Sequence, residues 1–441
     1  MLVSADSLRE LHSRHILTPW SVQKAGDPPM IVRAAGVYYE DAAGKRYLDL
    51  SSGLIAVNLG HGHPRVVTAI QQQAARLCYA PPSFGNDVRA ELGHELSSIA
   101  PWPEGARTFF TSSGADANED AIKIARMRSG RLKVLTAYRS FHGSTLGAST
   151  LTGENRRWAA EPGMPGVVRF FAPFPYRSPF HTSDPAEETR RALEHVELVL
   201  LHEDPARVAA IMLEPVVGSN GVIVYPPGYL QGLRDICDRH GIVLIFDEVM
   251  TGFGRVGAPF AAQRFDVVPD MITIAKGVTS AYVPLGGVLV RESLAAHFDT
   301  TMLWCGHTYA GHPLAMAAGL AALRAYGEGQ LFQRALQLES WLRSGLEALQ
   351  RKHAIVGDVR GIGAMFAIEL VWDRTTKEPL APWHGPASQV MKEFFSRLLQ
   401  RGVYAFGRFN VVMIAPPLVI QKSELDEGLA ALDAALSGMT A

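Results

Sequence analysis

Two short apolar runs, residues 241–246 and 271–275, constrain the fold of this chain more than any other part of its sequence. Both are continuous and rich in β-branched residues, and glycine or proline bounds each of them, as is typical of strands covered on both faces. A charged residue follows each run, Asp247 after the first and Lys276 after the second. Ligands of open α/β sheets bind just beyond the carboxyl ends of the strands, so we expect both charges at a ligand-binding edge.

An acid and an amine at such strand ends match the needs of one cofactor, pyridoxal phosphate. Its ring accepts electrons only while the ring nitrogen stays protonated, and a carboxylate such as Asp247 can hold that proton. A lysine whose pKa is lowered by its surroundings, as we expect for Lys276, can form a Schiff base with the aldehyde of the cofactor. Other interpretations remain open. An Asp-Glu pair after a strand is often a helix cap or a metal ligand, and a strand-end lysine is often merely solvated.

A phosphate site is the third requirement, and the sequence holds a candidate early in the chain. The strand predicted over residues 107–111 ends in a turn of small residues, Ser113, Gly114 and Ala115, at which a helix begins. Free amides at a helix N-terminus bind phosphate, and small residues let the backbone approach the anion. The Ser113 hydroxyl can add a hydrogen bond. The alternative is a capping box, because Ser113 and Asp116 have the required spacing without any ligand.

The composition argues against several classes of protein. The chain has 441 residues and a formal net charge of −1, and no basic run interleaved with aromatic residues indicates nucleic-acid binding. Three widely spaced cysteines, an odd number, argue against a disulfide framework and a zinc site, so no metal is expected. No apolar segment is long enough to span a bilayer, and the N-terminus lacks the basic and apolar regions of a signal peptide. We therefore expect a soluble protein of the reducing cytoplasm.

The chain is long enough for a large domain and a second, smaller one. Residues 36–49 predict two strands around a turn, at the end of an N-terminal arm. From about residue 60 to 327, predicted strands alternate with amphipathic helices such as that over 229–240, the pattern of a parallel sheet with helical crossovers. Residues 162–185 are rich in proline and phenylalanine without clear periodicity, so we expect a long loop there, over the active-site side.

The last part of the chain predicts a mixed C-terminal lobe. A long helix follows residue 330, and after it come a strand pair around 356–370, a helix over 388–401 and a closing helix over 422–436. We accordingly expect an N-terminal arm with part of the small domain, a large cofactor-binding domain and a C-terminal small domain. Their ranges are 1–58, 59–329 and 330–441.

Several further motifs occur in an order that resembles one family, the class III pyridoxal-phosphate aminotransferases of fold type I. The resemblance extends over nearly the whole chain, and these motifs lie at residues 58–64, 141–143, 214–221 and 306–313. It implies an α/β fold, with a mainly parallel central sheet flanked by helices in a large domain and a smaller α+β domain. It also implies ping-pong transfer of an amino group from a donor to a 2-oxo acid, with pyridoxal phosphate as cofactor. The assembly it implies is a homodimer with shared active sites, or a tetramer.

The resemblance implies a role for each residue that matches a family motif. Lys276 would form the Schiff base with the cofactor and then move the proton between substrate and cofactor, while Asp247 would pair with the ring nitrogen. Thr308 would reach the phosphate of the neighbouring subunit's cofactor, although without the family it fits a turn cap before the next helix. The residues that would cup the phosphate within the subunit are Ser113, Gly114 and Ala115.

Further matches would surround the cofactor ring. Phe141 would stack on one face of the ring and Val249 would press on the other, while Glu214 would lie near the cofactor on the substrate side. His142 and Glu248 fall within the same motifs and would support these residues from behind. Without the family, Phe141 and Val249 fit ordinary core packing, and Glu214 fits the end of a strand.

The substrate-binding residues depart from part of the family. Ile55 stands where relatives that accept arylalkylamines often carry an aromatic residue, and Phe406 stands where they tend to have a mobile arginine. Arg408 can still bind the carboxylate of a 2-oxo acid through two hydrogen bonds, and its alternative is a solvated arginine in a strand turn. The combination of Pro19-Trp20, the segment 176–181 and Phe409-Asn410 is most similar to taurine and β-alanine aminotransferases. The expected donor is taurine, β-alanine or 4-aminobutyrate, and the expected acceptor is pyruvate or 2-oxoglutarate.

Other activities remain open on the same residues. Racemases, aminomutases, decarboxylases and amine transaminases with a broad donor range share this fold and lysine. A racemase needs no oxo-acid acceptor and a decarboxylase releases carbon dioxide, so their products distinguish them. The intact lysine, acid and phosphate cup oppose a non-catalytic scaffold. The absence of a Gly-x-Gly-x-x-Gly motif after a first strand opposes a nicotinamide-dependent oxidoreductase.

Overall fold

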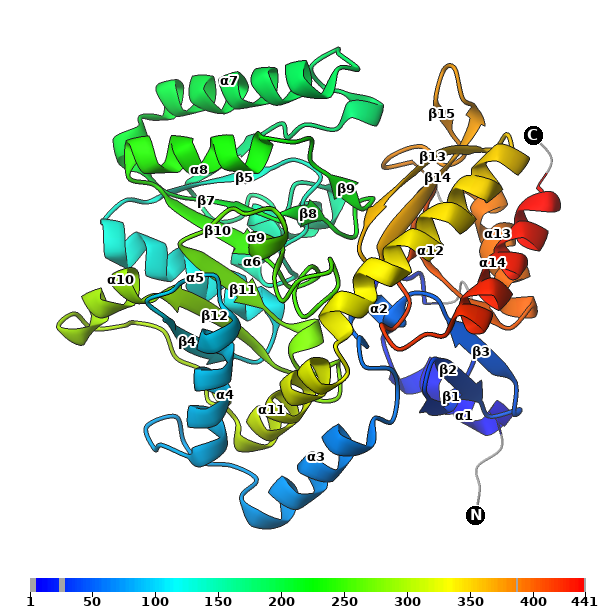
Figure 1. The fold of residues 1–441 in the computed structure, drawn as a ribbon, viewed down its shortest axis with the longest axis horizontal. Coiled ribbons are helices and arrows are strands. Elements are labelled where there is room, and N and C mark those ends of the chain that lie inside the picture. The colour runs from blue at the N-terminus through cyan, green and yellow to red at the C-terminus, as the bar shows by residue number, and fades with distance from the viewer. Residues whose placement is uncertain (1–4, 24–27, 386–387, 440–441) are drawn as a thin grey trace.

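The computed structural model describes residues 5–23, 28–385 and 388–439, so the outermost residues of the two terminal ranges expected above lie outside it. Figure 1 shows a large sheet with its helices on the left, and smaller sheets with long helices on the right. The N-terminal strands lie on the right as well, near the C-terminal helices. The two ends of the chain therefore build one part of the molecule together.

A seven-stranded sheet forms the centre of the larger part. Its order is β4-β12-β11-β10-β7-β5-β6. β12 runs antiparallel to its two neighbours, and the other strands are parallel to one another. The predicted α/β fold with a mainly parallel sheet is therefore confirmed. The strands are β4 (Ala106–Thr111), β5 (Lys133–Ala137), β6 (Val167–Phe170), β7 (Val208–Leu213), β10 (Val243–Asp247), β11 (Met271–Ile274) and β12 (Gly286–Arg291).

The two apolar runs predicted to be buried strands form the neighbouring strands β10 and β11. The strands pair in parallel, with Asp247 opposite Thr273 near their carboxyl ends. Every residue of both strands is buried, which explains why neither run alternates with polar residues. Lys276 follows β11 after one intervening residue. Asp247 and Lys276 therefore lie at the same edge of the sheet, as predicted.

Helices surround this sheet. Figure 1 shows α7 and α8 above it in that view, and α3, α4 and α11 below it. α7 packs against α8, and α11 packs against α3 and α4. α8 is the amphipathic helix predicted over 229–240. The helices of this part are α3 (Pro64–Arg76), α4 (Asp87–Ile99), α5 (Gly114–Ser129), α6 (Leu146–Leu151), α7 (Pro185–Glu203), α8 (Tyr229–His240), α9 (Ala261–Arg264), α10 (Glu292–Ala295) and α11 (Pro313–Glu328).

The region 162–185 was expected to be one long loop, and that prediction is wrong. It contains β6, which pairs in parallel with β5 at the edge of the large sheet, with Val134 opposite Val167. A 3₁₀ turn over Pro175–Arg177 follows. β6 has four residues, most of them only partly buried, so it shows no continuous apolar pattern among the surrounding prolines.

The smaller part contains two sheets. The hairpin predicted over 36–49 forms β2 and β3, and β3 also pairs in parallel with β16, which gives the order β1-β2-β3-β16. The second sheet has the order β13-β14-β18-β17, with β15 beside β14. The predicted strand pair and C-terminal helices are thus present. The strands are β1 (Ile31–Ala35), β2 (Tyr38–Asp41), β3 (Arg46–Asp49), β13 (Val356–Ile362), β14 (Met365–Asp373), β15 (Glu378–Pro379), β16 (Val403–Tyr404), β17 (Phe406–Arg408) and β18 (Val411–Ile414).

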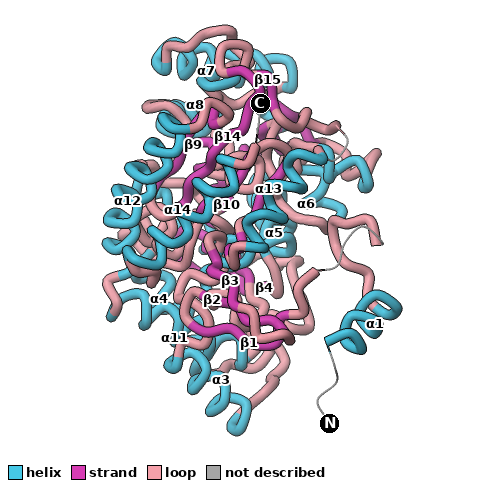
Figure 2. Tube along the Cα trace, turned by 90° about the vertical axis from the view of Figure 1, so that its right-hand side faces the viewer, coloured by secondary structure: helices cyan, strands magenta, loops and turns pink. Residues whose placement is uncertain are grey.

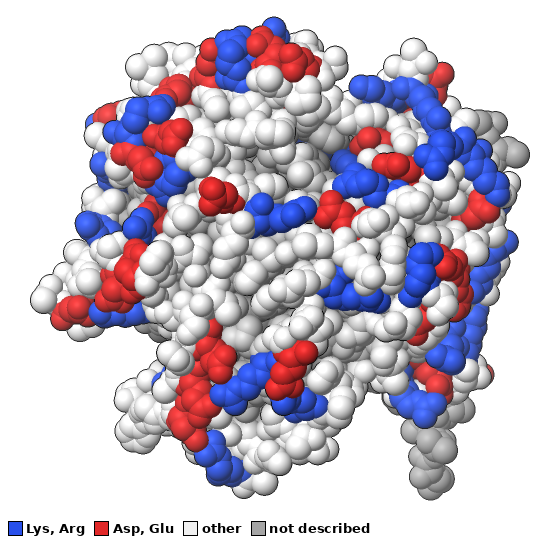
Figure 3. Space-filling view, in the orientation of Figure 1, with Lys and Arg blue, Asp and Glu red and all other residues white. Residues whose placement is uncertain are grey.

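The remaining elements lie around these sheets. They are the helices α1 (Ala5–His15), α2 (Ser52–Ile55), α12 (Leu331–Lys352), α13 (Gln389–Gln400) and α14 (Lys422–Ser437), and a small pair of strands, β8 (Val216–Val217) and β9 (Ile223–Val224). Figure 2 shows α1 at the rim of the molecule. On the face in Figure 3, acidic and basic side chains are interspersed, in agreement with the small net charge. Of the helices described, none is both long and apolar enough to cross a membrane.

Arg255 joins the two parts of the fold, and its side chain is fully buried. Its Nη1 donates to the carbonyl oxygens of Ala364 (3.1 Å) and Pro416 (2.6 Å). Its Nη2 donates to Ser52 Oγ (3.1 Å) and Asn58 Oδ1 (2.5 Å). Burial lowers the pKa of the guanidinium to about 10. Because these acceptors come from both ends of the chain, loss of Arg255 would leave buried oxygens without a donor.

We expect Arg255→Leu to lower the free energy of unfolding by about 3 kcal/mol or more, because several buried acceptors lose a charged donor at once. The matched change Arg324→Leu removes an exposed arginine paired with Glu91 and Glu95, and should cost less than about 1 kcal/mol. Urea denaturation of both variants measures the difference. Equal losses in the two variants would contradict the joining role of Arg255.

Candidate active site

A cavity of about 1000 Å³ lies beyond the carboxyl ends of β10 and β11. The larger part contributes residues such as Lys276 to its lining, and β17 of the smaller part contributes the segment Phe406–Arg408. The cavity therefore lies between the two parts of the fold, and several predicted site residues line it. These are Trp20, Ile55, Ser113, Ala115, Phe141, Lys276 and Arg408.

Lys276 has a strained backbone and a perturbed amine. Its φ of +45° lies in the left-handed region, which is unfavourable for a lysine and often marks a functional site. Burial lowers the pKa of the amine to about 8, although the nearby carboxylates of Glu214 and Asp247 act in the opposite direction. Within the described part of the chain, the structure records no hydrogen-bond partner for this amine. A fraction of Lys276 is therefore uncharged and nucleophilic near neutral pH.

Asp247 is a buried carboxylate, 3% exposed, with three donors. Oδ2 accepts hydrogen bonds from Asn118 Nδ2 (2.8 Å) and His142 Nδ1 (2.7 Å), and Oδ1 accepts one from the Val249 amide (3.1 Å). The Thr273 hydroxyl donates to Asn118 Oδ1 (2.7 Å), so the amide group of Asn118 is oriented with its nitrogen toward Asp247. These donors stabilise a charge that would otherwise be costly to bury.

His142 completes the network around Asp247. Its side chain is fully buried, and its Nε2 lies 3.3 Å from the Thr136 hydroxyl. Its backbone amide donates to Thr152 Oγ1 (3.0 Å), and its carbonyl accepts from Asn118 Nδ2 (2.7 Å). His142 thus contacts Asp247 directly and is not among the residues that line the cavity. Asn118 lies in the motif that begins at Ser113, but no pattern in the sequence marks it as a partner of Asp247.

The N-terminus of α5 is capped and still has free amides. Ser113 Oγ accepts from the Asp116 amide (3.2 Å) and donates to Asp116 Oδ2 (2.9 Å), so the capping interpretation is confirmed for this serine. The amides of Gly114 and Ala115 have no recorded acceptor within the described residues, and Ala115 lines the cavity. A Cβ on Gly143 would lie 2.4 Å from Ala115 Cβ, so this glycine permits a close approach to the helix start.

Glu214 and Val249 lie just outside the cavity lining. Glu214 is buried, and its carboxylate accepts from the amides of Phe141 (2.9 Å) and Gly218 (2.8 Å). Burial, with a further contribution from Asp247, raises its pKa to about 7. Val249 packs against the start of α5, where a Cβ at Gly114 would come within 2.9 Å of Val249 Cγ2.

The Glu248 side chain holds the backbone that follows β10. Its buried carboxylate accepts from the amides of Ala261 (2.5 Å) and Ala262 (2.9 Å) at the start of α9, and from the Thr251 hydroxyl (2.9 Å). Burial raises its pKa to about 7 despite these hydrogen bonds. Glu248 therefore stabilises the chain after β10, while Asp247 beside it belongs to the network below the cavity.

Arg408 is mostly buried, and the alternative of a solvated arginine is wrong for this conformation. Its Nη2 donates to Glu154 Oε2 (2.5 Å) and Asn155 Oδ1 (2.5 Å). Burial and then the charge of Arg156 lower the pKa of Arg408 to about 10. We missed Glu154 and Arg156 in the sequence. They follow Gly153 in a segment without periodicity, and only the fold brings them to Arg408.

The other predicted residues differ in their environment. Ile55 is buried, whereas Trp20 is 66% exposed, and both have a positive φ. Thr308 is exposed and does not belong to the lining of the cavity in its own chain. Its carbonyl accepts from the Tyr79 hydroxyl (3.0 Å).

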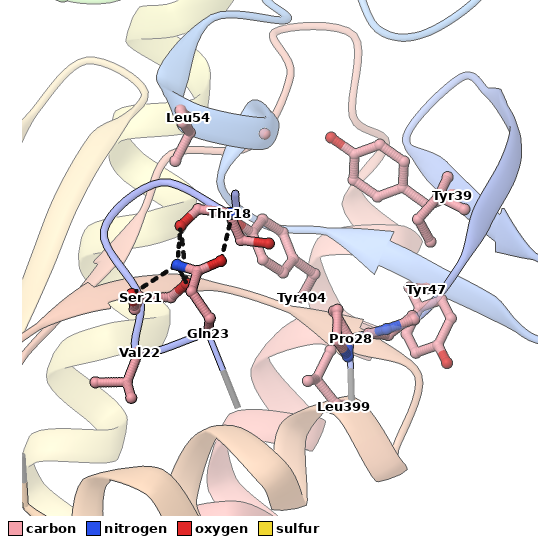
Figure 4. Close-up of a pocket in the computed structure, with 13 residues that line it drawn as sticks. Thr18, Ser21, Val22, Gln23, Pro28, Tyr39, Tyr47, Leu54, Leu399 and Tyr404 are labelled. Carbon is pink, nitrogen blue, oxygen red and sulfur yellow. Dashed lines mark hydrogen bonds between the residues drawn. The ribbon is translucent and has the colours of Figure 1, made fainter. Parts of the chain in front are cut away.

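A second cavity, of about 650 Å³, lies beside the N-terminal segment (Figure 4). There Gln23 Nε2 donates to the carbonyls of Thr18 (3.0 Å) and Ser21 (3.0 Å). Leu54 lines both cavities. The described residues that line this second cavity include three tyrosines but no lysine, arginine, histidine, cysteine or acid, whereas the first cavity contains Lys276 and two arginines.

Comparison with known proteins gives consistent matches over nearly the whole chain. A family model described as "Aminotransferase class-III" matches residues 21–436. The structure of taurine:2-oxoglutarate aminotransferase from Bifidobacterium kashiwanohense, in complex with PLP and glutamate, is 43% identical, with a TM-score of 0.96 over 99% of this chain and 98% of that chain. An omega-aminotransferase of Caulobacter vibrioides is 37% identical over 420 residues, 90% of this chain and 91% of its own. A taurine–pyruvate aminotransferase of Bilophila wadsworthia is 32% identical over 97% of this chain and 96% of its own.

The lowered pKa of Lys276 predicts an unusual pH dependence of its reactivity. The ligand-free protein is treated by reductive methylation, in which only a neutral amine reacts. We expect the methylation rate of Lys276 to rise about tenfold per pH unit below pH 8 and to level off above about pH 8. Peptide mass spectrometry across pH 6–11 measures the rate, and other lysines in the same sample provide the reference. A midpoint near 10.5, the ordinary lysine value, would contradict the assignment.

Proposed function

Because the chain belongs to the class III aminotransferases, which use pyridoxal phosphate, we propose that it moves the amino group of a small ω-amino acid to a 2-oxo acid. The family membership confirms the resemblance found in the sequence. One observation carries the substrate class: the cavity that contains Lys276 also contains two arginines, Arg156 and Arg408. Two guanidinium groups suit substrates that carry an acid group, such as taurine, β-alanine or 4-aminobutyrate.

The residues around the cavity fit the cofactor. The buried carboxylate of Asp247 suits a protonated ring nitrogen, and the amides of Gly114 and Ala115 suit a phosphate. The partly neutral amine of Lys276 suits an aldehyde. When bound, the cofactor withdraws electrons from the carbon that carries the amino group of the substrate.

We assign the chemistry to Lys276 and Asp247. Lys276 would hold the cofactor aldehyde through its amine, and the same amine, when free, would take the proton from the substrate carbon that carries the amino group and give it back to the cofactor side. Asp247 would keep the ring nitrogen protonated, and its carboxylate is already held in place by the hydrogen bonds from Asn118 and His142. Glu214, held by two backbone amides, would lie on the substrate side. The acceptor oxo acid then undergoes the same steps in reverse.

The other predicted residues would hold the cofactor in place. Phe141 and Val249 would flank its ring, and His142 would act through Asp247, to which it donates a hydrogen bond. Trp20 and Ile55 would border the substrate, since both line the cavity with Lys276. The residues that would contact the phosphate are Ser113, Gly114 and Ala115.

We propose a homodimer, with a tetramer as the alternative, in which Thr308 completes the phosphate site of the partner subunit. The proposal is supported by the exposure of Thr308 and by large apolar side chains near it on the surface. Met302 is 63%, Trp304 76% and Tyr309 61% exposed in the single chain. Such a group of exposed apolar side chains favours contact with another protein surface. We likewise propose the three-part division at residues 58 and 329, and a cytoplasmic location.

The proposed activity is tested with a panel of donors and acceptors. We expect taurine, β-alanine or 4-aminobutyrate to change the absorbance of the holoenzyme in the absence of acceptor, and pyruvate or 2-oxoglutarate to restore it. Chromatography of the products should then show alanine or glutamate in amounts equal to the donor consumed. Release of carbon dioxide, or conversion of a donor without an acceptor over many turnovers, would instead indicate a decarboxylase or a racemase.

Asp247→Asn should lower kcat about 100-fold or more, because a neutral side chain cannot hold the proton on the ring nitrogen. The control Asp204→Asn removes an exposed carboxylate that pairs with Arg207 and accepts from the Ala206 amide, a hydrogen bond that asparagine can keep, and should leave kcat within about twofold. Steady-state kinetics with the best donor measure both. Near-normal turnover in Asp247→Asn would contradict its role.

A further inference from the structure

The Thr308 loop, residues 301–312, leads into α11 and has little support from its own main chain. Residues 302–307 belong to no helix or strand. Within the described part of the chain, the structure records no backbone–backbone hydrogen bond for residues 302–306. The Ala310 amide donates to the His307 carbonyl (3.1 Å), which closes a turn around Thr308. The position of this turn therefore depends on side-chain contacts with other elements.

Asp120 of α5 makes the charged contact with this loop. Its side chain is fully buried, and its Oδ2 lies 2.5 Å from Nε2 of His307. Its Oδ1 accepts from Nζ of Lys123, on the same helix, at 2.9 Å. Burial, and then the charge of Asp120, raise the pKa of the Cys305 thiol in the same loop to about 12. A buried carboxylate is costly unless it is paired, so the contact with His307 ties the loop to α5.

The loop is also held on either side of His307. Leu303 packs against a buried apolar cluster that includes Ala117 of α5. The Tyr79 hydroxyl donates to the Thr308 carbonyl (3.0 Å). The Thr308 hydroxyl itself has no recorded partner within the described residues, and the residue is exposed. The main chain of Thr308 is thus fixed while its hydroxyl stays available to a ligand.

The same helix carries the phosphate cup of its own subunit. The amides of Gly114 and Ala115 at its N-terminus have no recorded acceptor within the described residues. Asp120 lies about 9 Å further along the axis, since an α-helix rises about 1.5 Å per residue. One rigid helix therefore holds both the phosphate cup and the loop that carries Thr308.

We propose that Asp120 is a positioning residue for the cofactor of the partner subunit, because through His307 it fixes the loop from which Thr308 reaches that cofactor's phosphate. The inference rests on the proposed dimer and on the cofactor assigned above. A hydroxyl that is already in place loses little conformational freedom when it binds, so the contact strengthens the hold on the phosphate. α5 thereby links the phosphate sites of the two subunits.

The rate at which cofactor leaves the holoenzyme tests this role. Asp120→Asn leaves His307 a weaker, uncharged acceptor, and His307→Leu removes the donor from the loop. We expect each change to speed release about 5- to 10-fold, because a charge-assisted hydrogen bond is lost or weakened. Absorbance after dilution measures the rate, with a phosphatase present to destroy free cofactor.

The chain offers a matched control in Asp433→Asn. Asp433 also pairs with a lysine and a histidine, Lys352 and His353, at 2.6 Å each. It belongs to α14 and does not line the cavity. This variant should release cofactor at the rate of the unmodified enzyme. Equal acceleration in Asp433→Asn and Asp120→Asn would show a general loss of stability and overturn the proposal.

A double-mutant cycle with Thr308 separates positioning from other effects. Thr308→Ala removes the hydroxyl and should speed release at least as much as Asp120→Asn. Asp120→Asn added to Thr308→Ala should then cause no further change, because the group that Asp120 positions is gone. Thr308→Ser keeps the hydroxyl and should stay within about twofold of the unmodified rate. Additive effects of the two changes would contradict the proposal.

Mixed dimers show in which subunit Asp120 acts. One subunit carries Lys276→Ala, so the Schiff-base absorbance reports only on the cofactor of the intact subunit. Asp120→Asn in the Lys276→Ala subunit should speed release from its intact partner, whereas Asp120→Asn in the intact subunit should have little effect there. The reverse result would show that Asp120 only stabilises its own helix.

The remaining outcomes separate this inference from the function on which it rests. If the chain is a monomer by light scattering, or Thr308→Ala does not change release, the shared site fails and the inference fails with it. If Thr308→Ala speeds release but Asp120→Asn and His307→Leu do not, only the inference is overturned. Thermal denaturation verifies that each variant is folded. His307 is 28% exposed, so His307→Leu carries the test if the buried Asp120 does not tolerate replacement.

Discussion

The buried Asp247 carboxylate is the interaction on which the rest of the site depends. A carboxylate in this position is tolerable only because Asn118, His142 and the Val249 amide donate to it. Asn118 belongs to α5 and is oriented by Thr273 of β11, while His142 belongs to the turn after β5. The network therefore fixes the start of α5 relative to the strand end that precedes Lys276. The free amides of α5, the Asp247 carboxylate and the Lys276 amine therefore have fixed relative positions.

The second part of the fold completes the wall of the cavity. β17 brings Arg408 to the cavity wall, and Arg255 holds the two parts together through oxygens at both ends of the chain. The strained Lys276 lies just beyond β11 of the large sheet, whereas Arg408 lies in β17 of a smaller one. The cavity thus combines an amine from the larger part of the fold with a guanidinium from the smaller part.

The sequence predicts those features that are encoded locally. β10 and β11 are continuous apolar runs, and α8 has a clear amphipathic period, so their positions follow from pattern alone. β6 was missed because a short, half-exposed edge strand has no such pattern. The pairing of Arg408 with Glu154 spans 254 positions of sequence, and no local signal marks it. Ser113 shows the opposite case, since its cap was predictable from spacing.

Borohydride reduction of the holoenzyme, followed by peptide mass spectrometry, tests the central assignment most directly because it fixes the cofactor to the residue that carries it. We predict the cofactor mass on the peptide that contains Lys276. Taurine added before reduction, without an oxo acid, should abolish this label, and 2-oxoglutarate should restore it. Cofactor attached to another lysine, or a label on Lys276 that no ω-amino acid removes, would contradict the site and the function proposed for it.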